Sequence, residues 1–106
     1  MNFRIRTVLD ELQRRFQALY GERLLRLVLF GSQARSDAEP GSDIDLLVVL
    51  KGRVSPGDEI ARTGDIVAEL SLQFDQVICC LFMDEERFET RNGPLLRNIR
   101  REGIPV

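Results

Sequence analysis

Apolar and polar positions alternate along the chain with two different periods. Between residues 2 and 20 the apolar side chains recur every three or four positions, at Ile5, Val8, Leu9, Leu12, Phe16 and Leu19. This spacing predicts an amphipathic helix, and Gly21 is well placed to end it. The apolar runs at residues 24–30 and 44–50, each interrupted by a single charged residue, instead predict two buried strands.

The second half of the chain repeats the helix and strand patterns. Helical spacing returns from Asp58, a candidate cap, to about Gln73, at Ile60, Thr63, Val67, Leu70 and Phe74. Residues 75–82 read as a third strand, and a crossover of this length predicts that strands two and three run parallel. Acidic residues at 84–89 suit the start of a helix. Pro94 and Gly103 then bracket a last helix, with three apolar residues predicted to face inward: Leu95, Leu96 and Ile99.

The candidate chemistry lies between the first two strands. Gly31 lets the backbone approach a ligand closely, and Ser32 begins a segment, 32–35, that suits the first turn of a short helix facing an anion. A Pro40-Gly41 turn feeds the second strand. There Asp43 and Asp45 should project from one face, roughly 7 Å apart along the strand. Two such carboxylates repel each other unless a cation lies between them, and oxygen ligands favour Mg²⁺ or Mn²⁺.

A phosphate cradle beside a carboxylate pair suits a metal-bound nucleoside triphosphate. The alternative interpretation is a Gly-Ser turn followed by a solvated acidic loop. Either half of the pattern alone would favour that alternative, whereas the ordered combination is rare by chance. No GxxxxGK[ST] motif occurs, which excludes a P-loop nucleotide site.

Composition narrows the function further. The 106 residues, 43% hydrophobic, suit a single domain over residues 1–106, and without a long apolar segment or signal-peptide pattern a cytoplasmic protein is expected. Fifteen basic against seventeen acidic residues disfavour nucleic-acid binding.

Cys79 and Cys80 should point to opposite faces of a strand, which favours core packing over a disulfide. Because the chain lacks histidine, any catalysis must use carboxylates and metal.

The residues also carry a family resemblance. Gly31-Ser32, ten residues, then Asp43-Ile44-Asp45 resembles the GS-x10-DxD signature of the DNA polymerase β-type nucleotidyltransferases. With Ala34-Arg35 and the core at residues 42–46, the chain is similar to the minimal nucleotidyltransferases, small domains that are often antitoxins beside HEPN ribonucleases. The resemblance implies an α/β fold with a small mixed sheet of about three core strands. The first two strands would be antiparallel, and helices would cover one face.

The same resemblance implies roles for individual residues. Asp43 and Asp45 would bridge two Mg²⁺ ions, or Mn²⁺, and Asp75, at the start of the third strand, would supply a third carboxylate. A simple turn aspartate is the alternative for Asp75. Gly31 and Ser32 would hold the β- and γ-phosphates of ATP. Arg35 would contact the nucleotide or pair with Asp37, the structural role being favoured, and Ser36 stands where the family commonly has glycine.

The activity implied is AMP transfer from ATP to a hydroxyl, expected to be a tyrosine, of a HEPN toxin. Larger relatives append domains that bind the acceptor, so here we expect a partner protein to present it. Two alternatives remain at this point. The chain could be an antitoxin that neutralises its partner by binding alone, or it could transfer the nucleotide to a small molecule such as an aminoglycoside.

Overall fold

The structure is a computed structural model in which residues 3–39 and 41–106 are described. Three residues lie outside the described ranges: Met1, Asn2 and Pro40. The predicted Pro40-Gly41 turn is therefore described only at Gly41. The elements follow in this order: α1 (Phe3–Tyr20), η1 (Gly21–Arg23), β1 (Leu24–Phe30), α2 (Ser32–Arg35), β2 (Ile44–Leu50), α3 (Pro56–Phe74), β3 (Ile78–Asp84), α4 (Glu85–Thr90), α5 (Pro94–Glu102) and β4 (Ile104–Pro105).

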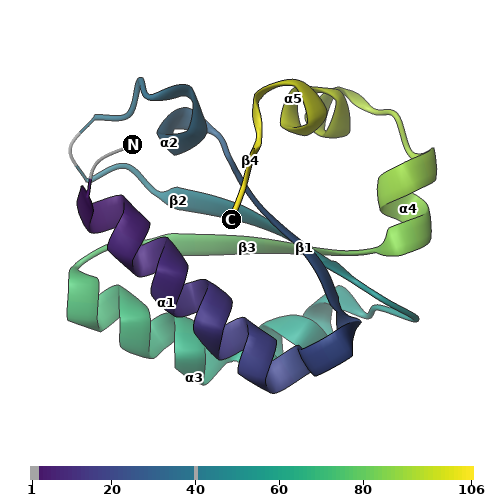
Figure 1. Cartoon of the computed structure of the whole chain (residues 1–106), viewed down its shortest axis with the longest axis horizontal. Coiled ribbons are helices and arrows are strands. Elements are labelled where there is room, and N and C mark those ends of the chain that lie inside the picture. The colour runs from purple at the N-terminus through teal and green to yellow at the C-terminus, as the bar shows by residue number, and fades with distance from the viewer. Residues whose placement is uncertain (1–2, 40) are drawn as a thin grey trace.

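The strands form one mixed sheet in the order β3-β2-β1-β4 (Figure 1). β1 runs antiparallel to β2 and β2 runs parallel to β3, as predicted. The prediction of about three strands missed β4, which pairs with β1 through only two residues, one of them Pro105. So short a pairing leaves no periodic pattern in the sequence. The chain end is held as well, because Val106 N donates to Leu27 O at 2.8 Å.

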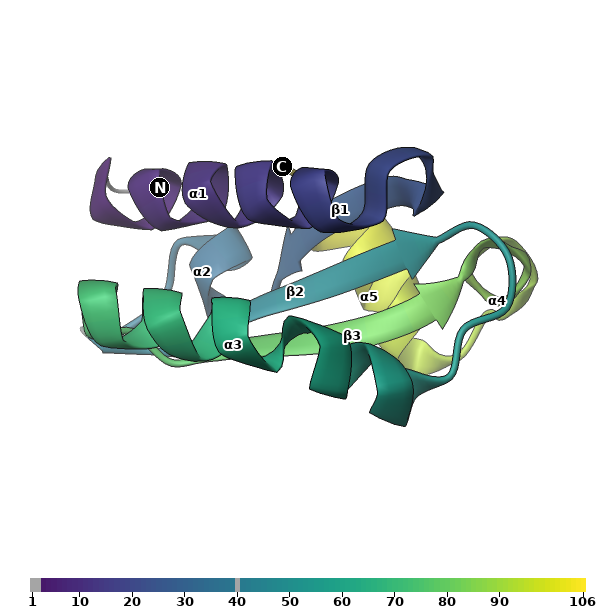
Figure 2. The same cartoon turned by 90° about the horizontal axis from the view of Figure 1, so that it is seen from below.

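Helices cover both faces of the sheet, so the expectation of one covered face is wrong. α1 and α3 lie on one side, and α4 and α5 lie on the other (Figure 2). The cause is visible in β2, where every residue except the half-buried Asp45 is apolar and buried, on both faces of the strand. Leu46, Val48 and Leu50 belong to the α1–α3 core. Leu47 and Val49 pack with Leu96 and Ile99 of α5.

Two element boundaries differ from the prediction because of backbone conformation. Ser55, not Asp58, is the N-cap of α3; Pro56 occupies the first turn and Asp58 lies inside the helix. At the other end of α3, Asp75 adopts a left-handed conformation (φ 50°, ψ 53°), and its N–H bonds Ser71 O. This residue ends the helix, so β3 begins only at Ile78 and not at residue 75.

Burial corrects several inward-facing assignments. Ile60 and Leu95 are 58% and 48% exposed, and Leu19 is exposed as well. An adjacent residue is buried in each case, namely Tyr20, Glu59 and Leu96, and of these only Leu96 was predicted to face inward. Both cysteines are free, but Cys79 is exposed and only Cys80 packs against the core. No helix in the described part of the chain is long and apolar enough to cross a membrane.

Candidate active site

Gly31 brings the end of β1 directly against a carboxylate of β2. It has φ 76° and ψ −158°, a backbone conformation that disfavours a side chain. A Cβ built on Gly31 would lie 2.5 Å from Oδ2 of Asp45. The preceding residue, Phe30, is the antiparallel partner of Asp45, which fixes this approach. A side chain at position 31 would therefore displace the Asp45 carboxylate, and the positive φ also favours glycine there.

The two predicted carboxylates occupy the start of β2. Asp43 is exposed just before the strand, and Asp45 is half-buried within it. Strand alternation turns both away from Ile44, which is buried in the α1–α3 core. Burial, followed by the charge of Asp43, raises the pKa of Asp45 above its usual value. Among residues 3–39 and 41–106, no ion pair involves either carboxylate.

Two glutamine side chains hold the backbone at the entrance to β2. Gln33 of α2 donates from Nε2 to Ser42 O at 3.1 Å, and Gln76, between α3 and β3, donates to the same oxygen. Gln76 is buried. Together they tie the residue before Asp43 to two other segments. Sequence reasoning missed both glutamines, because their spacing in the chain carries no signal of a common target.

The short helix α2 follows Gly31. Ala34 N and Arg35 N donate to Gly31 O at 3.1 and 3.2 Å, so Ser32 is the first residue of the predicted helical turn. Arg35 pairs with Asp37 at 3.2 Å, as favoured from sequence, and also lies 3.7 Å from Oε2 of Glu102 on α5.

The helix ends at Ser36, which adopts a left-handed conformation with φ 62° and ψ 24°. This backbone favours glycine, which gives a physical reason for the family's preference at this position.

Asp75 does not lie where the sequence placed it. It is exposed at the end of α3, where Arg4 Nη2 donates to its backbone oxygen at 3.3 Å. Within the part of the chain that the structure describes, no three His, Cys, Asp or Glu side chains gather as a metal-binding group. The β3 residue in register with Asp45 is Cys79, whose Sγ is 3.8 Å from Oδ2 of Asp43. The role of Asp75 as a third carboxylate stays a prediction.

Comparison with known proteins decides the family. A family sequence model described as "Nucleotidyltransferase domain" matches residues 5–105. The chain belongs to this family. It is 35% identical over 86 residues to "Putative protein adenylyltransferase MJ0604" of Methanocaldococcus jannaschii, covering 79% of each chain.

Solved structures agree on the nucleotidyltransferase fold. A toxin–antitoxin crystallised with AMP-PNP matches with a TM-score of 0.62 and 19% identity, covering 93% of this chain and 69% of that one. A mutant of the toxin–antitoxin MntA-HpeT matches with a TM-score of 0.60 and 16% identity, covering 91% and 70%. At these identities the likeness establishes the fold.

The carboxylate pair of this nucleotidyltransferase suits a divalent cation. Its donors are oxygen atoms only, with Asp43 directly before β2 and Asp45 within it. Among residues 3–39 and 41–106, no arginine or lysine forms an ion pair with either carboxylate. Oxygen ligands of this kind match Mg²⁺ and Mn²⁺. Asp43 and Asp45 are therefore the residues that could hold such an ion.

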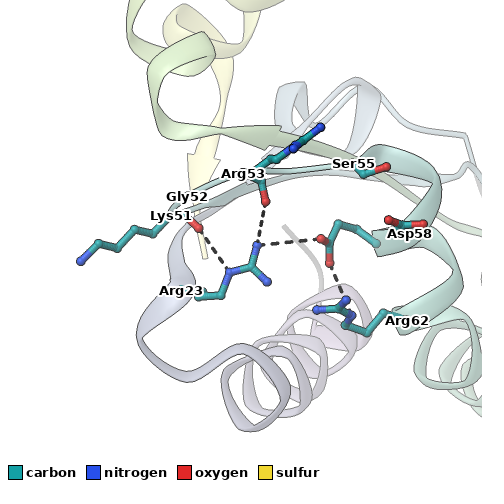
Figure 3. A pocket seen from close by; sticks show the side chains of 8 residues that line it. Arg23, Lys51, Gly52, Arg53, Ser55, Asp58 and Arg62 are labelled. Carbon is teal, nitrogen blue, oxygen red and sulfur yellow. Dashed lines mark hydrogen bonds and ion pairs between the residues drawn. The ribbon is translucent and has the colours of Figure 1, made fainter.

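A second polar site of the nucleotidyltransferase lies beyond the other end of β2. A cavity of about 450 Å³ opens there between η1, the loop after β2 and the start of α3 (Figure 3). Glu59, only 3% exposed, accepts a hydrogen bond from the Tyr20 hydroxyl at 2.8 Å. Arg23 and Arg62 approach the same carboxylate at 3.9 and 3.8 Å.

Arg23 also connects this site to the loop after β2. Its guanidinium donates to Lys51 O and Arg53 O, each at 3.2 Å. The Lys51 side chain points away from Arg62 (Figure 3). The Glu59 carboxylate and the guanidinium groups of Arg23 and Arg62 balance one another's charge. Their contacts, with those of Tyr20, join α1, η1, the loop after β2 and α3.

Proposed function

We propose that the chain transfers AMP from ATP to a hydroxyl group of a partner protein. The partner proposed is a HEPN-family toxin, the acceptor is a tyrosine, and the setting is the cytoplasm. The observation that carries the proposal is the contact of Asp45 with Gly31, which joins an uncompensated carboxylate pair to the start of α2.

The chain's own residues have separate tasks in this reaction. The backbone of Gly31 and the hydroxyl of Ser32 hold the β- and γ-phosphates, where the missing Cβ leaves room beside Asp45. Asp43 and Asp45 bind Mg²⁺, which, when bound, neutralises phosphate charge and aligns the reacting oxygens. Gln33 and Gln76 keep the carboxylate strand in place through Ser42 O.

The proposed step balances as a nucleotidyl transfer. The acceptor oxygen forms a bond to the α-phosphorus of ATP, and the bond from that phosphorus to the oxygen bridging the β-phosphate breaks. Pyrophosphate leaves, and the hydroxyl proton passes to solvent. Asp45 is held by β2 and by the close approach of β1, so the carboxylate pair is preorganised for this charge-rich reaction.

The relatives support the choice of substrate and partner. The Methanocaldococcus relative is named as a protein adenylyltransferase, and two structural neighbours are toxin–antitoxins, one of them with an ATP analogue. The name of the relative supports a protein acceptor, and the AMP-PNP of one neighbour supports ATP as the donor. Arg35, already paired with Asp37 and close to Glu102, is proposed to steady the phosphate loop and not to carry the chemistry.

The test is intact mass of a co-expressed HEPN-family partner after incubation with ATP and Mg²⁺. We expect the partner to gain one or more adenylyl groups with the wild type and none with Asp45→Asn. A partner that stays unmodified with the wild type, although the chain binds MgATP, would overturn the proposal.

A binding-only antitoxin is the second candidate, favoured by one observation. Cys79, and no third carboxylate, faces Asp43 and Asp45 from β3. Under this alternative the wild type and Asp45→Asn neutralise the partner equally well, and the partner carries no added nucleotide. Toxicity measured beside intact mass separates the two functions.

A further inference from the structure

The outer edge of β3 is open and has an unusual composition. β3 lies at one end of the sheet and, among residues 3–39 and 41–106, pairs only with β2. Natural edge strands are usually protected by lysine, proline, an inward charge or a bulge. From Ile78 to Met83 this strand has no charged residue and no proline. The edge is therefore suited to pairing with another strand.

An apolar groove follows the same edge. A cavity of about 340 Å³ lies between β3 and the neighbouring surface of α3. The space is open because Gly64 has no side chain and Ala68 has only a methyl group. Ile60, which is 58% exposed, also lines the groove. The groove can accept small apolar side chains from a strand laid along β3.

The geometry of β3 sets how the side chains of an added strand would alternate. Val77 O accepts a hydrogen bond from Ile44 N at 2.9 Å, so the backbone groups of Ile78, Cys80 and Phe82 turn toward the open edge. The side chains of these three residues lie on the α3 face. Cys79 lies on the opposite face, in register with Asp45. An added strand would place one row of side chains in the groove and the other row beside Cys79.

The distance from an added strand to Asp43 and Asp45 determines which side chain in the row beside Cys79 could reach them. An added strand would lie two strand spacings, roughly 9.6 Å, from β2. Cys79 stands between them, with Sγ 3.8 Å from Oδ2 of Asp43. A serine hydroxyl, one bond beyond Cβ, cannot pass over Cys79, whereas a tyrosine hydroxyl at the far end of its ring can.

We propose that the free edge of β3 is the docking site of the acceptor polypeptide. The polypeptide binds as an added strand, with apolar side chains in the groove beside α3 and a tyrosine in the row of Cys79. The phenol oxygen then attacks the α-phosphorus, pyrophosphate leaves, and the proton passes to solvent. This inference rests on the proposed function and specifies where its acceptor binds.

The probe is the blocked peptide Thr-Val-Tyr-Val-Thr, offered at millimolar concentration with MgATP. One matched peptide has serine in place of tyrosine, and another has methyl groups on its three central backbone nitrogens. Methylation removes the hydrogen bonds of an added strand and keeps every side chain. We expect mass spectrometry to find an adenylyl group on the tyrosine peptide alone.

Two protein variants test the groove itself. Ala68→Leu fills it and should lower kcat/KM for the tyrosine peptide at least tenfold, while leaving MgATP binding unchanged in calorimetry. Ala61→Leu is the matched control, because Ala61 is exposed on α3 and does not line the groove. It should behave as the wild type.

The remaining outcomes separate the two proposals. An unmodified HEPN-family partner in the co-expression test would count against the proposed function. Where that partner is modified, docking at β3 is overturned by an unlabelled tyrosine peptide, by equal labelling of the methylated peptide or by full activity of Ala68→Leu. A wild-type dimer that Ala68→Leu dissociates would also overturn it, because a second copy would then occupy the edge.

Discussion

The two carboxylate sites near opposite ends of β2 differ in how their negative charge is compensated. Glu59 is almost fully buried, yet a tyrosine hydroxyl and two guanidinium groups surround it. Asp45 is only half-buried, but its nearest charged neighbour is Asp43, which helps to raise its pKa. A buried charge is stable where the protein supplies its partners. A carboxylate pair left without partners is instead suited to a ligand from outside.

Tyr20 shows how completely the Glu59 site is closed. Burial, and after it the hydrogen bond to Glu59, raises the pKa of the Tyr20 hydroxyl well above its ordinary value. The hydroxyl therefore remains a hydrogen-bond donor at neutral pH. The Glu59 network is a structural joint, and its cavity needs no ligand to explain the burial of the acid.

The largest expected effect comes from removing one acid of the uncompensated pair. Asp45→Asn should lower adenylyl transfer by about 10³-fold or more, because the metal-binding charge is lost at the reacting phosphate. Circular dichroism should stay that of the wild type. Transfer retained within tenfold would show that Asp45 is not part of the active site.

Replacing Glu59, whose charge is compensated, should lower the stability of the fold. Glu59→Ala removes the partner of Tyr20, Arg23 and Arg62, and we expect a loss of about 2–3 kcal/mol in the free energy of unfolding. Urea unfolding measures the loss. Glu69→Ala is the control, because its ion pair with Arg15 is exposed, and it should change stability by about 0.5 kcal/mol or less. Equal losses in both variants would remove the distinction between the two kinds of acid.

Gly31→Ala tests the contact that joins the carboxylates to the phosphate cradle. The new methyl would meet Oδ2 of Asp45, and we expect MgATP affinity in calorimetry to fall about tenfold or more, equivalent to at least about 1.4 kcal/mol. Gly41→Ala is the matched control: it has φ 84°, a similar strain, but open space around its Cβ position. If both variants bind MgATP equally weakly, backbone strain and not crowding is responsible.

Asp45 should also make metal-free stability depend on pH. Its folded-state pKa is raised, so its contribution is fully present below the unfolded-state pKa and is lost as pH rises through the folded-state value. Metal-free Asp45→Asn should therefore melt slightly higher than the wild type at neutral pH, with the difference shrinking in acid. Mg²⁺ affinity of the wild type should rise over the same pH window. A melting difference independent of pH would contradict this account.

Asp75→Asn should have the smallest effect. Asparagine tolerates the left-handed backbone at this position, so stability should be unchanged. Because the structure gathers no described group of three metal-ligating side chains, we expect transfer to fall less than tenfold. A loss comparable to that of Asp45→Asn, with MgATP binding retained, would confirm Asp75 as the third carboxylate.

Local patterns were sufficient for most elements and for the carboxylate pair. Alternation along a strand puts Asp43 and Asp45 on one side whatever surrounds them, and the apolar runs defined β1 and β2 to the residue. The same reasoning failed at element ends. The left-handed backbone of Asp75, which ends α3, has no periodic signature. That Glu59 is buried while Ile60 is exposed depends on the contacts of Glu59 with Tyr20 and Arg23.

The sequence by itself therefore determined the family, the mixed α/β fold and the pair of acids, since these depend on residue order and spacing. Only the tertiary structure decided which side chains meet across strands. Register placed Cys79 beside the pair, and folding brought Gln33 and Gln76 to one carbonyl oxygen. Except for Gln33 with Ser42, these contacts join residues more than thirty positions apart, as in Cys79 with Asp43. No local pattern encodes them, because they follow from how the helices and strands pack.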